Sequence, residues 1–115
     1  MATIEECRTA LEKLSDNMRN AEGDVRAATE LDRSVSCRIT DLDVTFVGRM
    51  ADGRIHVHDT VRGAPPDKAQ IRLAMAGDDL VALVDGDLNF ARAWASGRVK
   101  LEASLPDLFR LRKLL

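Results

Sequence analysis

Residues 69–115 read AQIRLAMAGDDLVALVDGDLNFARAWASGRVKLEASLPDLFRLRKLL, and the fold of the whole chain depends on this stretch. Apolar residues alternate from Ile71 to Met75, then recur at helical spacing, alternate again around Leu101 and end in a wide apolar stripe. Alternation is typical of a half-buried strand, and a repeat of three to four residues is typical of a helix. The stretch therefore predicts strand, helix, helix, strand and helix, and it contains no recognisable set of catalytic residues.

Polar residues and glycines mark the boundaries of these predicted helices. Asp78 or Asp79 suits a helix start, because a carboxylate satisfies free amides and faces the positive end of the helix dipole. N-cap residues and C-terminal glycines mark the other boundaries: Gly86, Asn89, Gly97 and Ser104.

The N-terminal segment is predicted to be an amphipathic helix. Thr3 and Glu6 have the spacing of a capping box, in which each side chain bonds the backbone amide of the other residue. Apolar residues follow at helical spacing, namely Ile4, Cys7, Leu11, Leu14 and Met18. Gly23 marks the predicted end of this helix, and a short helical turn over residues 24–31 is weakly indicated.

From Ser34 the apolar period changes to two, which predicts three strands with one buried face. The inward residues of these strands are Val35, Cys37 and Ile39, then Val44 and Phe46, then Ile55 and Val57. Residues 41–43 and the Asp52-Gly53 pair suit tight turns, so the order is an antiparallel meander. Gly63, Pro65 and Pro66 then predict a crossing loop, since proline cannot donate to a sheet.

Length and composition favour one globular domain over residues 1–115. The chain has 45% hydrophobic and 31% charged residues and a net charge of -2, without the basic excess that nucleic acid binding favours. Cys7 and Cys37 occupy apolar positions, which indicates reduced core thiols and a cytoplasmic location rather than a disulfide framework. No apolar run approaches the roughly 20 residues that a membrane span needs.

The run DDLVALVDGDLNFARAWASGRVKLEAS followed by LPDLFRLRKLL resembles the C-terminal half of the sterol carrier protein type 2 family, as a small stand-alone member of bacterial type. Two positions depart from the family pattern, since Phe90 stands where proline is frequent and Ala103 where glycine is frequent. The matching residues are Asp79, Leu80, Leu83, Val84, Gly86, Leu88, Asn89, Ala93, Gly97, Val99, Lys100, Leu101, Leu111 and Leu114.

This resemblance implies an α/β (α+β) fold in which a five-stranded mixed sheet is covered on one face by helices. It also implies non-catalytic binding or transfer of a fatty acid, fatty acyl-CoA, phospholipid or sterol in an apolar tunnel between sheet and helices. Ordinary core packing explains most single apolar residues equally well. The candidate ligand-binding residues are Leu80, Leu83, Val84, Phe90, Trp94, Leu105, Leu108, Phe109 and Arg112.

Arg112 is the charged member of this set. Its spacing from Leu105, Leu108 and Phe109 places it on the apolar side of the last predicted helix. One interpretation is a guanidinium that meets a ligand carboxylate or phosphate at the tunnel mouth. The other is a side chain whose stem packs while its charged end stays in water.

Metal binding and catalysis are both weakly supported. His56 and His58 share a strand face, but a third ligand at convincing spacing is absent, so two surface histidines are the simpler interpretation. We find no G-x-S-x-G elbow and no phosphate loop, and we expect no catalytic residues, no metal and no cofactor.

Three functional hypotheses remain, led by a lipid-binding or transfer domain. The second is a structural or protein-interaction domain with a closed core, and the third is an accessory subunit of an acyl- or steroid-processing enzyme. The expected partner is a hydrophobic small molecule, with transient membrane contact and no nucleic acid. A monomer or a weak homodimer is expected.

Overall fold

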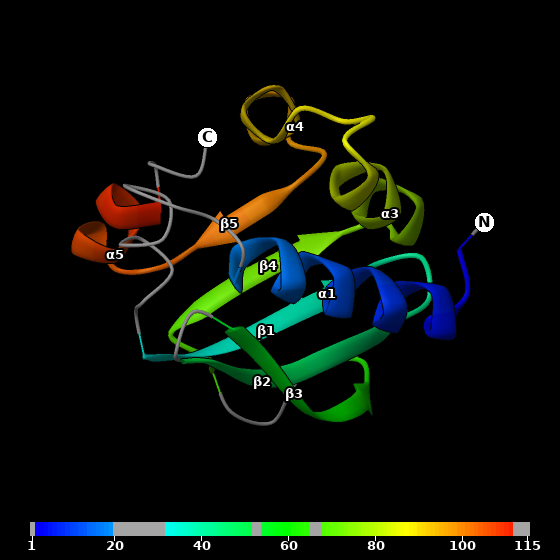
Figure 1. Ribbon diagram of the computed structural model, residues 1–115, viewed down its shortest axis with the longest axis horizontal. Coiled ribbons are helices and arrows are strands. Elements are labelled where there is room, and N and C mark those ends of the chain that lie inside the picture. The colour runs from blue at the N-terminus through cyan, green and yellow to red at the C-terminus, as the bar shows by residue number, and fades with distance from the viewer. Residues whose placement is uncertain (1, 20–31, 52–53, 65–67, 112–115) are drawn as a thin grey trace.

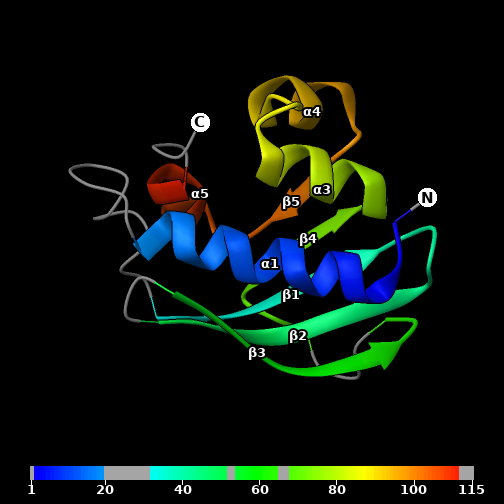
Figure 2. The ribbon, with the colours of Figure 1, turned by 45° about the vertical axis from the view of Figure 1, so that its right-hand side comes forward.

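The computed structural model describes residues 2–19, 32–51, 54–64 and 68–111. Its elements, in chain order, are α1 (Ile4–Arg19), β1 (Arg33–Ile39), β2 (Val44–Ala51), β3 (Arg54–Arg62), β4 (Ile71–Met75), α3 (Gly77–Asp85), α4 (Phe90–Ser96), β5 (Lys100–Glu102) and α5 (Leu105–Leu111). The strands form one sheet in the order β3-β2-β1-β4-β5. Figures 1 and 2 show the helices gathered over one face of this sheet.

The sheet is mixed, as expected. β1, β2 and β3 form the predicted antiparallel meander, whereas β4 pairs with β1 in parallel and with β5 antiparallel. Because β4 lies on the other side of β1 from β2, the chain must cross the sheet between β3 and β4. The Thr45 hydroxyl of β2, which is fully buried, donates to the Gly63 carbonyl at 2.6 Å, so the start of this crossing is bonded to the sheet.

The helix boundaries largely follow the predicted signals. Thr3 and Glu6 exchange hydrogen bonds of 3.1 and 3.2 Å, which confirms the capping box. The Asn89 side chain accepts from the Arg92 amide at 3.0 Å. Gly86 and Gly97 take positive φ angles at the ends of α3 and α4.

The start of α3 differs from the sequence expectation. Its N-cap is Ala76, which has no side chain to bond an amide, and Asp78 and Asp79 follow two and three residues later, in the first turn. The carboxylate of Asp41, from the turn between β1 and β2, accepts from the Gly77 amide at 2.9 Å instead. A residue distant in sequence therefore provides the cap.

Two apolar clusters lie between the sheet and the helices. The larger apolar cluster joins α1, α3 and the centre of the sheet, and its buried members include Cys7, Leu11, Cys37, Ile39, Phe46, Met75 and Leu80. The smaller apolar cluster consists of buried Val35, Met50 and Ile71, with partly buried Leu14, Ile55, Leu101 and Ala103 packed against it. The apolar interior is thus divided along the sheet.

Three predicted features lie outside the described residues. They are the Asp52-Gly53 turn, residues 65 and 66 of the crossing loop, and the segment from Gly23 to Leu31.

Candidate functional site

A row of residues runs across the sheet on the face toward the helices. The strand pairing places Thr60, Phe46, Cys37, Leu73 and Leu101 side by side on β3, β2, β1, β4 and β5. Phe46 and Cys37 are 2% and 3% exposed, whereas Leu73 and Leu101 are only partly buried. The helix layer therefore covers β1 and β2 more completely than β4 and β5.

Leu73 is partly exposed although its strand is not an edge strand of the sheet. β4 is paired on both sides, and the neighbouring inward residues Ile71 and Met75 are each buried. Leu73 packs against the larger apolar cluster, and its cross-strand partner Leu101 packs against the smaller one. The pair Leu73–Leu101 therefore lies where the two clusters meet, and its partial exposure marks an incompletely covered apolar part of the sheet.

The predicted site residues of α3 and α4 lie on one side of this pair. Leu80 is 2% exposed and belongs to the packed core, whereas Leu83, Val84 and Phe90 are partly buried at the edge of the larger apolar cluster. Trp94 is also partly buried, with its ring centroid 6.2 Å from that of Phe90. Leu83, Val84 and Phe90 thus all pack against the larger apolar cluster, while Leu80 belongs to its buried part.

The predicted site residues of α5 form a separate group. Leu108 is partly buried, but Leu105 is 72% exposed, so it presents its side chain to solvent rather than to the core. The side chain of Phe109 and the whole of Arg112 lie outside what the structure describes. The proposed role of Arg112 stays a prediction.

Sequence reasoning missed Leu73 and Leu101 as candidate site residues. Their alternation with charged neighbours correctly predicted strands, but partial exposure depends on how the helices lie over the sheet. The long-range parallel pairing of β4 with β1 brings Leu73 beside Cys37, and no local pattern encodes that register.

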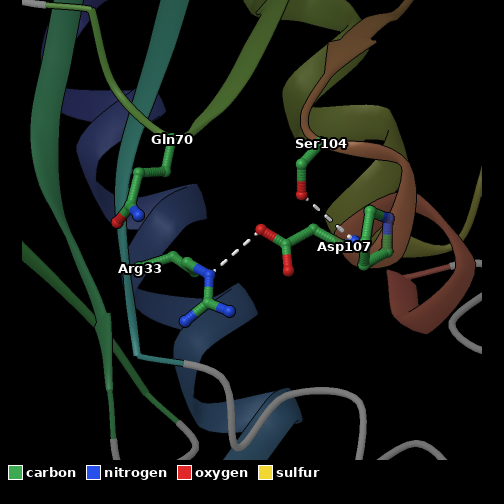
Figure 3. A pocket seen from close by; sticks show the side chains of 5 residues that line it. Arg33, Gln70, Ser104 and Asp107 are labelled. Carbon is green, nitrogen blue, oxygen red and sulfur yellow. Dashed lines mark hydrogen bonds and ion pairs between the residues drawn. The ribbon is translucent and has the colours of Figure 1, made fainter.

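A polar cleft of about 380 Å³ lies at one end of the sheet, beside α5. It is lined by Arg33 at the start of β1, Gln70 just before β4, and Ser104, Pro106 and Asp107 at the start of α5. Figure 3 shows Arg33 and Asp107 pointing toward each other across it. Arg33 Nε donates to Asp107 Oδ2 at 3.0 Å, and Asp107 is only 4% exposed.

A second hollow, of about 370 Å³, lies on β3 next to α1. It is lined by Arg8, Val57, His58, Asp59 and Thr60. Both hollows are lined mainly by polar residues, in contrast to the aliphatic surroundings of Leu73 and Leu101.

The described residues offer little that resembles a reactive group. Burial is the main cause that raises the pKa of the Cys7 thiol, helped by the negative charges of Asp41, Glu6 and Asp78. Burial likewise raises the pKa of Cys37 to about 12, with a smaller contribution from Cys7. Both thiols are therefore protonated near neutral pH and poor nucleophiles.

Neither a metal centre nor a membrane span is found in the described part of the chain. His56 and His58 are exposed on the edge strand β3, and no group of three potential metal ligands occurs among residues with described positions. No helix in the described ranges is long and apolar enough to cross a bilayer.

These features define a small α/β domain whose helix layer leaves part of an apolar sheet face incompletely covered. The model of the SCP-2 sterol transfer family matches residues 10–115, and the chain therefore belongs to that family. This match confirms the family resemblance drawn from the C-terminal half. Comparison with curated proteins found no matching sequence.

Solved structures show the same fold at low sequence identity. The sterol carrier protein domain 2 of Helicoverpa armigera aligns with a TM-score of 0.65 and 16% identity, over 98% of this chain and 89% of that chain. Sterol carrier protein 2 from Aedes aegypti, determined in complex with the C16 fatty acid palmitate, aligns with a TM-score of 0.62 and 17% identity, over 99% and 96%. The predicted five-stranded mixed sheet with helices is thus confirmed.

The fold also occurs inside a larger enzyme. The inverting sec-alkylsulfatase Pisa1 from Pseudomonas sp. aligns with a TM-score of 0.57 and 18% identity, over 90% of this chain but only 16% of the sulfatase. This chain therefore corresponds to a small part of that protein.

Proposed function

We propose that this domain binds one hydrophobic ligand with a long aliphatic part, and that it acts as a binder or carrier without catalysing a reaction. The ligand's apolar part lies over β4 and β5, in contact with Leu73 and Leu101. The partial exposure of this cross-strand pair, on the helix-covered face of β4 and the edge strand β5, is the observation that carries the proposal.

The physical driving force is the burial of apolar surface. Each methylene group removed from water contributes about 0.8 kcal/mol, so an aliphatic chain that covers Leu73 and Leu101 gains affinity from both sides of the contact. Aromatic residues make up only 3% of the chain, and tyrosine is absent. The resulting aliphatic surface suits a flexible acyl chain better than it suits stacking on a planar ring.

We assign the contacts above the ligand to partly buried residues of the surrounding helices. They are Leu83 and Val84 of α3, Phe90 and Trp94 of α4, and Leu108 of α5. Leu80 supports this wall from within the packed core. The palmitate complex of the Aedes aegypti relative supports a fatty acyl ligand as the first class to test.

The test begins with native mass spectrometry of freshly purified protein, followed by titration with a fluorescent long-chain acyl probe. Unlabelled fatty acid, phospholipid and sterol then compete separately. We expect a saturable one-to-one complex with the probe, displaced by acyl lipids. The absence of both an adduct and saturable probe binding would contradict the proposal.

Two substitutions at one position make this test specific to the site. Leu73→Trp adds volume where the native side chain is partly exposed, so it should occupy the ligand position and weaken probe binding at least tenfold. Leu73→Ala serves as the matched control, because it removes volume and leaves the position open. Circular dichroism should show that both variants are folded, and equal probe affinity in the two would exclude Leu73 from the site.

A second candidate function is an accessory domain that presents or receives an acyl substrate for an enzyme. The occurrence of the fold within an alkylsulfatase favours it, together with the 72% exposure of Leu105 on α5. Such a domain would show turnover only with a partner protein. A closed interaction domain would instead show association that increases with protein concentration, and it would bind no acyl probe.

A further inference from the structure

The polar cleft beside α5 opens next to the smaller apolar cluster. Its residues are close neighbours in sequence of that cluster's members: Arg33 comes two residues before Val35, Gln70 directly precedes Ile71, and Ser104 directly follows Ala103. Leu101 belongs to the same cluster and is the partner of Leu73. The cleft and the apolar pair therefore lie along the same two chain segments, with Gln70 three residues before Leu73 and Ser104 three residues after Leu101.

The orientation of the Gln70 amide is determined by the backbone. The Ser34 backbone amide donates to Gln70 Oε1 at 3.0 Å, and the Gln70 backbone amide donates to Ser34 Oγ at 2.9 Å. Because Oε1 accepts the bond from Ser34, the other atom of the side-chain amide, Nε2, points away from this bond. Figure 3 shows this nitrogen on the side nearer to Ser104 and Asp107. Gln70 therefore presents a hydrogen-bond donor to the cleft.

Asp107 presents an acceptor on the opposite wall. Its Oδ2 accepts from Arg33 Nε at 3.0 Å, while Oδ1 receives no hydrogen bond from any described residue. The Asp107 backbone amide donates to Ser104 Oγ at 3.4 Å, which holds the residue in the first turn of α5. Counting only bonds between described residues, the cleft walls thus carry one donor group and one acceptor oxygen without a partner, and an ion pair whose charges cancel.

We propose that the polar cleft binds an uncharged, hydroxyl-bearing head of the ligand, with Gln70 Nε2 donating to the hydroxyl oxygen and Asp107 Oδ1 accepting its proton. This inference rests on the proposed function, since the ligand's apolar part lies over β4 and β5. The cleft volume of about 380 Å³ suits a polar head rather than a whole long-chain lipid.

Charge decides against an anionic head at this position. Arg33 is the only cation lining the cleft among the described residues, and the buried Asp107 carboxylate already neutralises it. A ligand carboxylate would stand beside Asp107 and compete with it for Arg33. A hydroxyl group avoids this repulsion and satisfies both walls, because it donates and accepts at once.

The test compares two ligands with the same chain and different heads, 1-dodecanol and dodecanoate, by displacement of the acyl probe at pH 8. With the unaltered protein, we expect dodecanol to bind about tenfold more tightly than dodecanoate. Asp107→Asn removes the negative charge while keeping an acceptor oxygen. It should abolish the preference by strengthening dodecanoate about tenfold and changing dodecanol less than threefold.

Two further variants guard against indirect effects. Gln70→Leu lies at an exposed position and should weaken dodecanol about fivefold, which tests the inference even if Asp107→Asn does not fold. Asp85→Asn is the matched control, because Asp85 is on the exposed end of α3 and pairs with Lys13 at 2.8 Å. It should change neither affinity.

The outcomes separate this inference from the proposed function. Saturable binding of both ligands with equal affinity, or tighter binding of dodecanoate by the unaltered protein, would overturn the neutral-head inference and leave lipid binding intact. Failure of the probe and of both ligands to bind would overturn the proposed function, and the inference with it.

Discussion

Gly48 shows how one missing side chain permits the sheet to form. The pairing of β2 with β3 changes register between Val47 and Gly48, and a Cβ atom added to Gly48 would lie 2.1 Å from the His56 carbonyl oxygen. That oxygen belongs to the backbone of the adjacent strand and cannot move without breaking the ladder. Glycine is therefore required by close backbone approach at this position.

We predict that Gly48→Ala lowers the free energy of unfolding by about 3 kcal/mol, at the upper end of the usual range for overpacking. Urea denaturation followed by circular dichroism measures this change. Gly86→Ala is the comparison, because Gly86 has a φ of 84° and open space around its Cβ position. It should cost only about 1 kcal/mol through backbone strain. Equal losses in the two variants would show that contact with His56 is unimportant.

The burial of Cys37 makes the stability of the folded protein depend on pH. Its pKa is raised from 9.0 to about 12, first by burial and then by Cys7. Since the folded protein binds the thiol proton more tightly than the unfolded chain, the stabilisation is complete below pH 9 and is lost as the pH rises toward 12.

We therefore predict that the free energy of unfolding falls between pH 9 and pH 12, and that part of this fall disappears in Cys37→Ala. Urea denaturation at a series of pH values gives both curves. The variant is less stable at neutral pH because it leaves a cavity, so only the slopes are compared. Parallel slopes for the two proteins would mean that Cys37 does not titrate differently on folding.

At the scale of elements, the start of α3 depends on a neighbouring turn. Ala76 cannot cap the helix, and the Asp41 carboxylate bonds the Gly77 amide in its place at 2.9 Å. This contact joins the β1–β2 turn to a helix that begins 36 residues later. It places the apolar side of α3 over the larger apolar cluster.

We predict that Asp41→Ala lowers the free energy of unfolding by about 1 kcal/mol, the usual effect of losing an N-cap. Asp85→Asn breaks an exposed ion pair at the other end of the same helix and should change stability by less than about 0.5 kcal/mol. Chemical denaturation of the two variants side by side tests the difference. A loss no larger than that of Asp85→Asn would show that the Asp41 cap contributes little.

Beyond the described end of α5, Arg112 remains a sequence-based prediction. If its guanidinium binds a ligand carboxylate, Arg112→Ala should weaken dodecanoate about tenfold and leave dodecanol unchanged. Arg110→Ala removes the same charge from the same segment and serves as the control. The displacement titration measures all four affinities.

Arg112 and the polar cleft predict opposite head preferences. Tighter binding of dodecanoate that depends on Arg112 would support carboxylate recognition and exclude the neutral head. Tighter binding of dodecanol that depends on Gln70 would support the cleft, and would leave Arg112 as a side chain whose charge stays in water.

For the molecule as a whole, the proposed ligand site depends on the incomplete cover of one sheet face. α1 and α3 enclose Cys37 and Phe46 almost completely, whereas the helix layer over β4 and β5 leaves Leu73 and Leu101 partly exposed. An ordinary core would bury a leucine such as Leu73, whose strand is paired on both sides. Binding and fold are therefore connected through the spacing of the helices rather than through any one motif.

The sequence alone determined the elements, the meander, most helix boundaries and the family, because these depend on periodicity, turn residues and caps that act over a few neighbours. It named Leu83, Val84 and Phe90, which pack against the larger apolar cluster, but it did not separate them from Leu80 in the packed core. Tertiary structure alone decided the parallel pairing of β4 with β1, the cap from Asp41, and the partial exposure of Leu73 and Leu101. It also decided the meeting of Arg33 with Asp107, 74 residues apart. These features depend on contacts between distant segments, and such contacts leave no local periodic signal.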